Sequence, residues 1–100
     1  MDLVKDFIRG AVQLHVMHHA CVDEVHGTGL IAELARHGHR LSPGTLYPML
    51  HRLEEAGLLD SRPEVVEGKR RRVYVATTSG KRAFHQCQAA LRELADEVLS

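Results

Sequence analysis

Three histidines and a cysteine lie close together near the N-terminus, and they are the side chains of this chain best suited to metal coordination. His15 and His19 are four residues apart, and His15 and His18 are three apart, so on a helix the imidazoles share a face and can bind one divalent ion. Cys21 adds a soft thiolate ligand three residues beyond His18. The group predicts a site for Zn²⁺ or Cd²⁺. Two other interpretations stay open: a pH-sensitive interface, or histidines without a special role.

A short run of cations, Lys69, Arg70 and Arg71, is the second chemical signal. The chain as a whole is neutral, because thirteen Lys and Arg residues balance thirteen Asp and Glu residues, so overall charge gives no argument for a nucleic-acid partner. Locally, three cations in a row can bind a phosphate backbone with an affinity that falls as salt rises. By itself such a run is also typical of a solvated turn. It indicates DNA binding only if a base-reading segment lies beside it.

The segment from Ser42 to Gly57 has the signals of one short helix with a polar outer face. Ser42 is a good N-cap, Pro43 suits the first helical position, and Gly57 can end the helix in the left-handed conformation. Apolar residues at i, i+3, i+4 and i+7 form the predicted buried stripe: Leu46, Met49, Leu50 and Leu53. The outer face carries side chains that can reach base edges or phosphates in a major groove: Thr45, Tyr47, His51 and Arg52. Ser42 and the free amides beside it favour a phosphate.

The segments before this helix must position it. In the segment 2–20 the apolar residues are spread around the whole circumference of a helix. This pattern predicts a helix that is buried on more than one side. A second helix follows and ends near Gly38. We expect His37 and His39, close to that end, to face solvent.

The last part of the chain predicts a hairpin and a final helix. Two β-prone runs, at 59–66 and 71–77, flank the polar turn 67–69. Thr78 or Ser79 then caps a helix whose apolar residues recur at steps of three and four. These residues form a seam that needs a partner, and we expect it to join two copies of the chain: Phe84, Cys87, Leu91, Leu94 and Val98.

The order helix, helix, helix, hairpin, helix is that of a winged helix-turn-helix with an added C-terminal helix. Four motifs occur within it in sequence order: Arg9-Gly10, His26-Gly27, the run Leu-Ser-Pro-Gly-Thr-Leu-Tyr-Pro at 41–48, and Arg71-Arg72-Val73-Tyr74. On these motifs the chain resembles the PadR family of bacterial transcriptional regulators, in the short form with a single C-terminal helix. The resemblance implies a homodimeric repressor that binds double-stranded operator DNA and releases it when a small molecule or stress signal binds.

Two expectations about histidines depend on this resemblance. The family usually has aliphatic residues where this chain has His15, His18 and His19, and ordinary packing gives no reason for that density of imidazoles. A metal ion is therefore the effector that the cluster predicts. His26 belongs to the family's usual His-Gly pair, and we expect it to be structural.

The predicted fold is mainly α with a small β-hairpin: residues 1–78 form a winged helix-turn-helix DNA-binding domain, and residues 79–100 form a C-terminal dimerisation helix. The predicted function is a DNA-binding transcriptional regulator, a homodimeric repressor that responds to a ligand or a metal ion. The alternative is a metal-binding or protein-binding winged-helix protein without direct promoter recognition. Neither a required cofactor nor an enzyme activity is expected, because the chain has no Gly-rich phosphate loop and no nucleophile motif. Without a signal peptide, a membrane-length apolar run or paired cysteines, we expect a cytoplasmic location.

Overall fold

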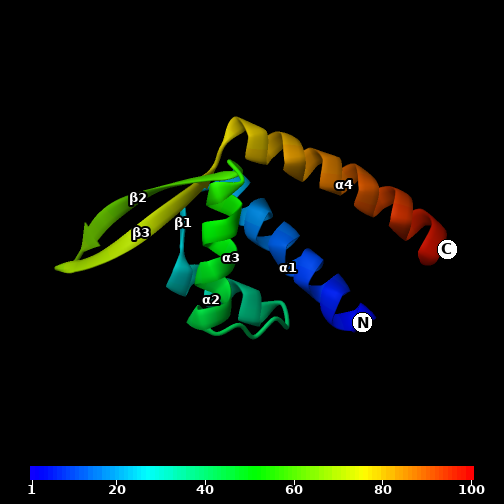
Figure 1. Ribbon diagram of the computed structural model, residues 1–100, viewed down its shortest axis with the longest axis horizontal. Helices are drawn as coiled ribbons and strands as arrows, with labels where there is room; N and C mark the ends of the chain where they lie inside the picture. Colours follow the sequence, from blue (N-terminus) through cyan, green and yellow to red (C-terminus); the bar gives the residue numbers. More distant parts are fainter.

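Helices make up most of the chain, and the computed structural model describes all 100 residues. The elements are, in order, α1 (Leu3–Val22), β1 (Val25–His26), α2 (Gly27–Arg36), α3 (Pro43–Glu55), β2 (Leu59–Val66), β3 (Lys69–Ala76) and α4 (Thr78–Val98). Figure 1 shows α2 and α3 near the centre, the β2–β3 hairpin extending to one side, and α4 extending to the other side beyond α1. The molecule is therefore elongated, with extents of 51 × 28 × 24 Å. None of its helices combines the length and the apolar character that a membrane crossing requires.

The predicted ends of α3 are confirmed. Ser42 has an extended backbone at the N-cap position, and Pro43 is the first helical residue. At the other end Gly57 has a φ of +78°, and the amide of Leu58 donates to the carbonyl of Leu53 at 3.0 Å, as in a Schellman ending. Both ends depend on local sequence alone, which explains why they could be placed without knowledge of the fold.

The predicted hairpin is confirmed, with two differences. Its turn contains only Glu67 and Gly68, both at positive φ, so Val66 pairs directly with Lys69 and β3 begins two residues before the predicted position 71. In addition, β1 pairs with β3 and makes a three-stranded antiparallel sheet of order β1-β3-β2. A strand of two residues is too short for alternation to reveal it in a sequence. The architecture is a winged helix-turn-helix with a long C-terminal helix.

The core lies where α1, α2, α3 and the sheet meet. The largest fully buried side chains come from all of these elements: Val16, Leu34, Leu46, Leu50 and Leu59. The expectation that the first helix is buried on more than one side is wrong for its first half. Residues 1–10 are all exposed, because α3 and α4 border this part of α1 without burying it.

The start of α4 differs slightly from the prediction. The N-cap is Thr77 rather than Thr78 or Ser79. The Thr77 hydroxyl accepts a hydrogen bond from the amide of Gly80 at 2.9 Å and donates one to the carbonyl of Gly57 at 2.6 Å. One side chain therefore caps α4 and also joins it to the turn that ends α3, a tertiary contact that no capping rule describes.

Candidate nucleic-acid interface

The polar side chains of α3 lie on an uncovered face of the molecule. The four predicted contact residues of this helix are all exposed: Thr45, Tyr47, His51 and Arg52. The apolar stripe of the same helix is turned toward the core, so the amphipathic prediction is confirmed. The Ser42 hydroxyl makes no capping bond to the helix amides and lies 3.3 Å from the Thr45 hydroxyl. It is therefore available to a phosphate at the helix start.

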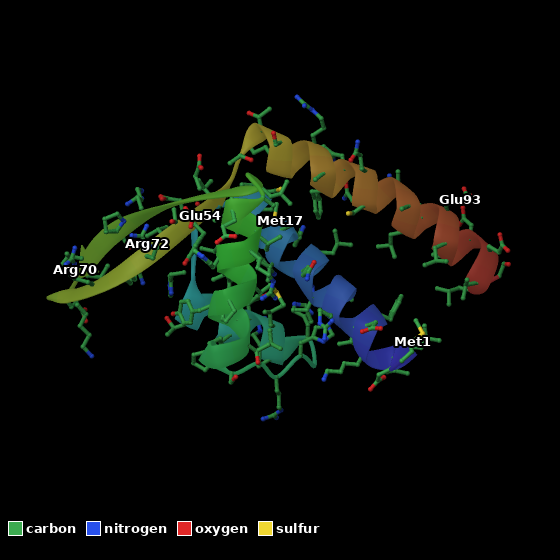
Figure 2. All side chains as sticks on the ribbon, viewed as in Figure 1. Met1, Met17, Glu54, Arg70, Arg72 and Glu93 are labelled. Carbon is green, nitrogen blue, oxygen red and sulfur yellow. The ribbon has the colours of Figure 1, made fainter.

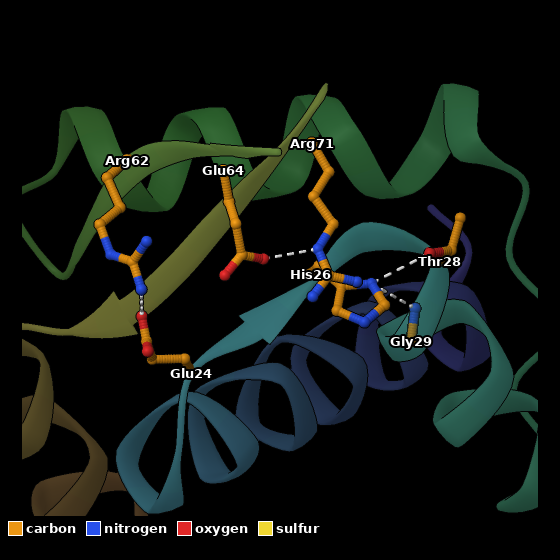
Figure 3. Close-up of polar contacts among 7 residues, drawn as sticks. All are labelled: Glu24, His26, Thr28, Gly29, Arg62, Glu64 and Arg71. Atoms are coloured by element: carbon orange, nitrogen blue, oxygen red, sulfur yellow. Dashed lines mark hydrogen bonds and ion pairs between the residues drawn. The ribbon is translucent and has the colours of Figure 1, made fainter. Parts of the chain in front are cut away.

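Tyr47 is held in place by the start of α2. Its phenol lies directly over Gly27, where any side chain would overlap the ring. The preceding residue, His26, caps α2: its Nδ1 accepts a hydrogen bond from the amide of Gly29 at 3.1 Å and lies 3.0 Å from the Thr28 hydroxyl (Figure 3). His26 is therefore structural, as expected. Its cap fixes the glycine surface on which Tyr47 rests.

A groove of about 330 Å³ lies beside Tyr47, between the start of α2 and the wing formed by β2 and β3. Four consecutive cations of β3 line it: Lys69, Arg70, Arg71 and Arg72. Figure 2 places Arg70 near the tip of the hairpin and Arg72 closer to the body of the molecule. The predicted base-reading helix and the predicted phosphate-binding cations therefore border one groove.

Part of the positive charge of the wing stabilises the wing itself. The Arg71 Nε donates to the Glu64 carboxylate at 2.7 Å across the hairpin (Figure 3). Arg62 of β2 pairs with Glu24, just before β1, and so connects the wing to the end of α1. Ion pairs between exposed side chains are weak, so a phosphate can compete with Glu64 for Arg71.

The other cations of the wing differ in their freedom. The Arg72 guanidinium donates to the Ser61 hydroxyl at 2.9 Å, and that hydroxyl donates in turn to the Glu54 carboxylate at 2.6 Å. This chain of hydrogen bonds holds Arg72 at the base of the wing. Lys69 and Arg70 are exposed and make no side-chain hydrogen bond or ion pair. These two have the most freedom to bind DNA phosphates.

Two cations that were not predicted from the sequence lie along the other side of α3. Lys5 and Arg9 of α1 line a second groove together with Thr45 and Arg52. The Arg9 guanidinium is 3.6 Å from the Asp6 carboxylate, and both side chains are about half exposed, so this pair contributes little. Lys5 and Arg9 are four residues apart, so they lie on one face of α1. Only the packing of α1 beside α3 shows that this face borders the predicted DNA-binding helix.

The predicted seam of α4 is mostly uncovered in the single chain. Phe84 packs partly against the core, and the other four seam residues are exposed: Cys87, Leu91, Leu94 and Val98. The first half of α1 presents further exposed apolar side chains: Leu3, Val4, Phe7 and Ile8. A cavity of about 550 Å³ lies between the two helices, with Phe7 and Leu91 in its wall. Contiguous apolar surface of this kind marks an interaction site.

Two of the α1 histidines turn toward the end of α2. The His15 ring centroid is 4.8 Å from that of His37, and 5.8 Å from those of His19 and His39. The expectation that His37 and His39 face solvent holds for His37, whose side chain is about half exposed, and is corrected for His39, which is half-buried. Both rings lie beside His15 of α1. The segment after α2 folds back onto α1, and residues about twenty positions apart meet there, which no local pattern can reveal.

The other two residues of the predicted metal set have different surroundings. The His18 side chain is exposed, and its ring lies 5.9 Å from that of Phe84 at the wall of the α1–α4 cavity. Cys21 is a free thiol packed against the hydrophobic core, and burial raises its pKa despite the opposing charge of Lys81. The four predicted ligands therefore do not surround one point.

Comparison with known proteins agrees with this architecture. The sequence pattern of the transcriptional regulator PadR-like family matches residues 14–86. The chain is 57% identical over 96 residues to transcriptional regulator Rv3488 of Mycobacterium tuberculosis, with 96% of this chain and 90% of that protein covered. A PadR family transcriptional regulator from Eggerthella lenta is similar in structure, with a TM-score of 0.85 and 32% identity over 96% of this chain and 85% of that one. Bacillus subtilis PadR, solved in complex with operator DNA, shares the fold with a TM-score of 0.71 and 18% identity over 78% of this chain and 46% of that one. This chain belongs to the PadR-like family of transcriptional regulators.

Proposed function

We propose that this chain is a homodimeric repressor and that two copies bind one double-stranded operator. The α3 helix of each copy lies in the major groove, and the wing lies against the flanking backbone. The observation that carries this proposal is the groove in which Tyr47 of α3 stands beside the free cations Lys69 and Arg70. The relative from Bacillus subtilis, which has the same fold, was solved with operator DNA and supports this mode of action.

The side chains divide between reading sequence and binding phosphate. Arg52 and Tyr47 are the base-reading residues, since a guanidinium can bind a guanine edge through two hydrogen bonds. His51 must first leave Glu55, because its Nε2 lies 2.7 Å from that carboxylate. The residues proposed to contact phosphate or sugar are Ser42, Thr45, Lys69, Arg70 and Arg71, with Lys5 and Arg9 on the opposite side of α3.

A second copy of the chain is proposed to cover the apolar residues of α4 and of the first half of α1. Homodimers normally have two-fold symmetry, so the same surface of each copy meets its equivalent. Two-fold symmetry can present both α3 helices to the same face of the DNA, as two half-sites of an operator require. The uncovered seam of Leu91, Leu94 and Val98 supports this arrangement.

Repression requires a signal that releases the operator, and we propose that an effector acts at the junction of α1 and α4. The cavity of about 550 Å³ between these helices has the size of a small-molecule site. Because both helices belong to the proposed dimer contact, a ligand there would change their angle and hence the spacing of the two α3 helices. An effector releases DNA only to the extent that it prefers the DNA-free arrangement.

The DNA-binding proposal is tested by selecting duplexes from a random pool with the full chain and then measuring affinity across a salt series. The double variant Lys69→Ala/Arg70→Ala should bind all sequences more weakly, and the slope of log K against log salt should fall by about 0.9 for each lost phosphate contact. Arg82→Ala, which removes an exposed cation of α4 outside the groove, is the control and should change neither value. A pool without enrichment, or an unchanged slope in the double variant, would refute the proposal.

A further inference from the structure

Two imidazole nitrogens approach the same carboxylate oxygen where α1 passes the end of α2. The Nε2 of His37 lies 3.3 Å from Oε1 of Glu33, and the Nε2 of His19 lies 4.0 Å from that same oxygen. The three side chains come from two elements, so their convergence is a product of the tertiary fold. His15 stands beside them, with its ring centroid 4.8 Å from that of His37 and 5.8 Å from that of His19.

The Nε2 atom of His19 has no partner, although it is buried. It is the one buried side-chain nitrogen or oxygen of the chain without a hydrogen bond, and its distance to Glu33 is too long for one. Buried polar atoms are nearly always satisfied, so an unsatisfied atom that points at a carboxylate needs an explanation. A cation bound between the nitrogen and the oxygen would satisfy both.

The protonation states of these groups suit a metal ion. Burial lowers the pKa of His15, and the neighbouring histidines, led by His37, lower it further. Burial also lowers the pKa of His19, with a contribution from His18 that outweighs Glu33. Burial acts to raise the pKa of Glu33, but Arg36 and His37 hold it below its ordinary value. Near neutral pH, His15 and His19 are therefore neutral and Glu33 is ionised, which is the state that a divalent ion requires.

Side-chain rotation is needed to bring the ligands into a tetrahedral site. As the side chains stand, no three His, Cys, Asp or Glu residues are arranged to hold an ion. With bonds of about 2.0–2.1 Å, a tetrahedral zinc ion keeps its ligand atoms about 3.4 Å apart and two imidazole centroids about 5 Å apart. The contact of His37 with Glu33 already fits, and that of His19 is slightly long. Rotation of Glu33 toward His19, with a matching rotation of His37, can close the set, because both side chains are partly exposed.

We propose that His19, His37 and Glu33 bind one divalent ion of the zinc class, with His15 as the fourth ligand. The donor set is three nitrogens and one oxygen, which suits Zn²⁺ and Co²⁺. It replaces the set predicted from the sequence, because Cys21 is packed into the core and the exposed His18 ring lies beside His19 and Phe84 rather than beside Glu33 or His37. The absence of a thiolate makes Cd²⁺ a poorer fit than Zn²⁺.

Such an ion would connect α1 to the end of α2, the helix that packs against α3. Its influence on operator binding rests on the proposed function, but ion binding itself does not. The experiment is therefore carried out on the full chain without DNA. If no ion bound, the DNA-binding proposal would be unaffected. If the chain bound no operator, the proposed ion site would likewise be unaffected.

The test is titration of the metal-free protein with Co²⁺, followed by visible absorption, and with Zn²⁺, followed by calorimetry. One ion per chain and the intense visible bands of tetrahedral Co²⁺ are expected. His37→Ala and Glu33→Gln, both changes at partly exposed positions that leave the core intact, should lower the affinity by about tenfold or more. His18→Ala, Cys21→Ser and His85→Ala should bind as the wild type does, because these residues lie outside the set.

Circular dichroism of each variant shows that loss of binding is not loss of folding. Affinity no tighter than about millimolar in the wild type would overturn the proposal. Equal binding by the wild type, His37→Ala and Glu33→Gln would overturn it as well. A loss confined to His18→Ala and Cys21→Ser would place the ion at the sequence-predicted set instead.

Discussion

Tyr47 owes its position to the missing side chain of a residue twenty positions earlier. Its phenol rests on Gly27, and the cap formed by His26 holds that glycine at the first position of α2. A pre-positioned aromatic ring at a DNA-binding face loses little freedom on binding. The Gly27 surface is therefore as much a part of the proposed DNA interface as the residues that touch DNA.

The variant Gly27→Ala tests this dependence. The new methyl group must displace the exposed end of Tyr47, so the free energy of unfolding should change by less than about 1 kcal/mol while operator affinity falls about tenfold. Fluorescence anisotropy measures the affinity, and urea unfolding measures the stability. The matched control is a double-mutant cycle: Gly27→Ala should have no further effect on affinity once Tyr47→Ala is present. Additive losses would show that Gly27 acts independently of Tyr47.

At the scale of single elements, the junction between α3 and α4 depends on Thr77. Its hydroxyl caps α4 and also bonds to the Gly57 carbonyl, so Thr77→Ala should lower the free energy of unfolding by about 1–2 kcal/mol. Thr78→Ala removes an exposed hydroxyl one residue later and should cost less than about 0.5 kcal/mol. Urea unfolding at one fixed protein concentration compares the two. Equal losses would contradict the assignment of the cap.

The seam of α4 carries the prediction about dimerisation. Leu91 is 49% exposed in the single chain, so Leu91→Asp should leave the fold intact but place a carboxylate in an apolar interface, at a cost of several kcal/mol to association. Sedimentation at micromolar concentration should show a dimer for the wild type and a monomer for the variant. Gln86→Asp adds the same charge beside the seam and should remain dimeric. A monomeric wild type, or a dimeric Leu91→Asp protein, means that the seam has another role.

The elements differ in how far the sequence could predict them. α3 was predicted with both ends, because its cap, its Schellman ending and its apolar stripe are all local signals. β1 was missed, because its two residues form a strand only by pairing with β3. The cluster around Glu33 was missed for a related reason: His19 and His37 come together only when the segment after α2 folds back on α1.

At the scale of the whole molecule, a chain without net charge concentrates cations where DNA is proposed to bind. Lys5 and Arg9 lie along one side of α3, and Lys69 and Arg70 lie beside Tyr47 in the groove on the wing side. Helix α4, which carries the exposed apolar residues Leu91, Leu94 and Val98, extends away from the wing (Figure 1). Because the proposed surfaces for DNA and for a second copy are separate, one small domain can bind DNA and dimerise at the same time. The net charge of zero gave no indication of these cationic surfaces, because the fold determines which charged side chains lie near one another.

Hydroxyl-radical footprinting of a selected duplex shows whether two copies bind one operator through two α3 helices. We predict two protected half-sites about one helical turn, or roughly 10 base pairs, apart, with two chains bound per duplex. Insertion of five base pairs between the half-sites should abolish tight binding, because it turns one half-site to the opposite face of the DNA. A single protected site with one chain per duplex, or binding that is insensitive to the insertion, would contradict the account.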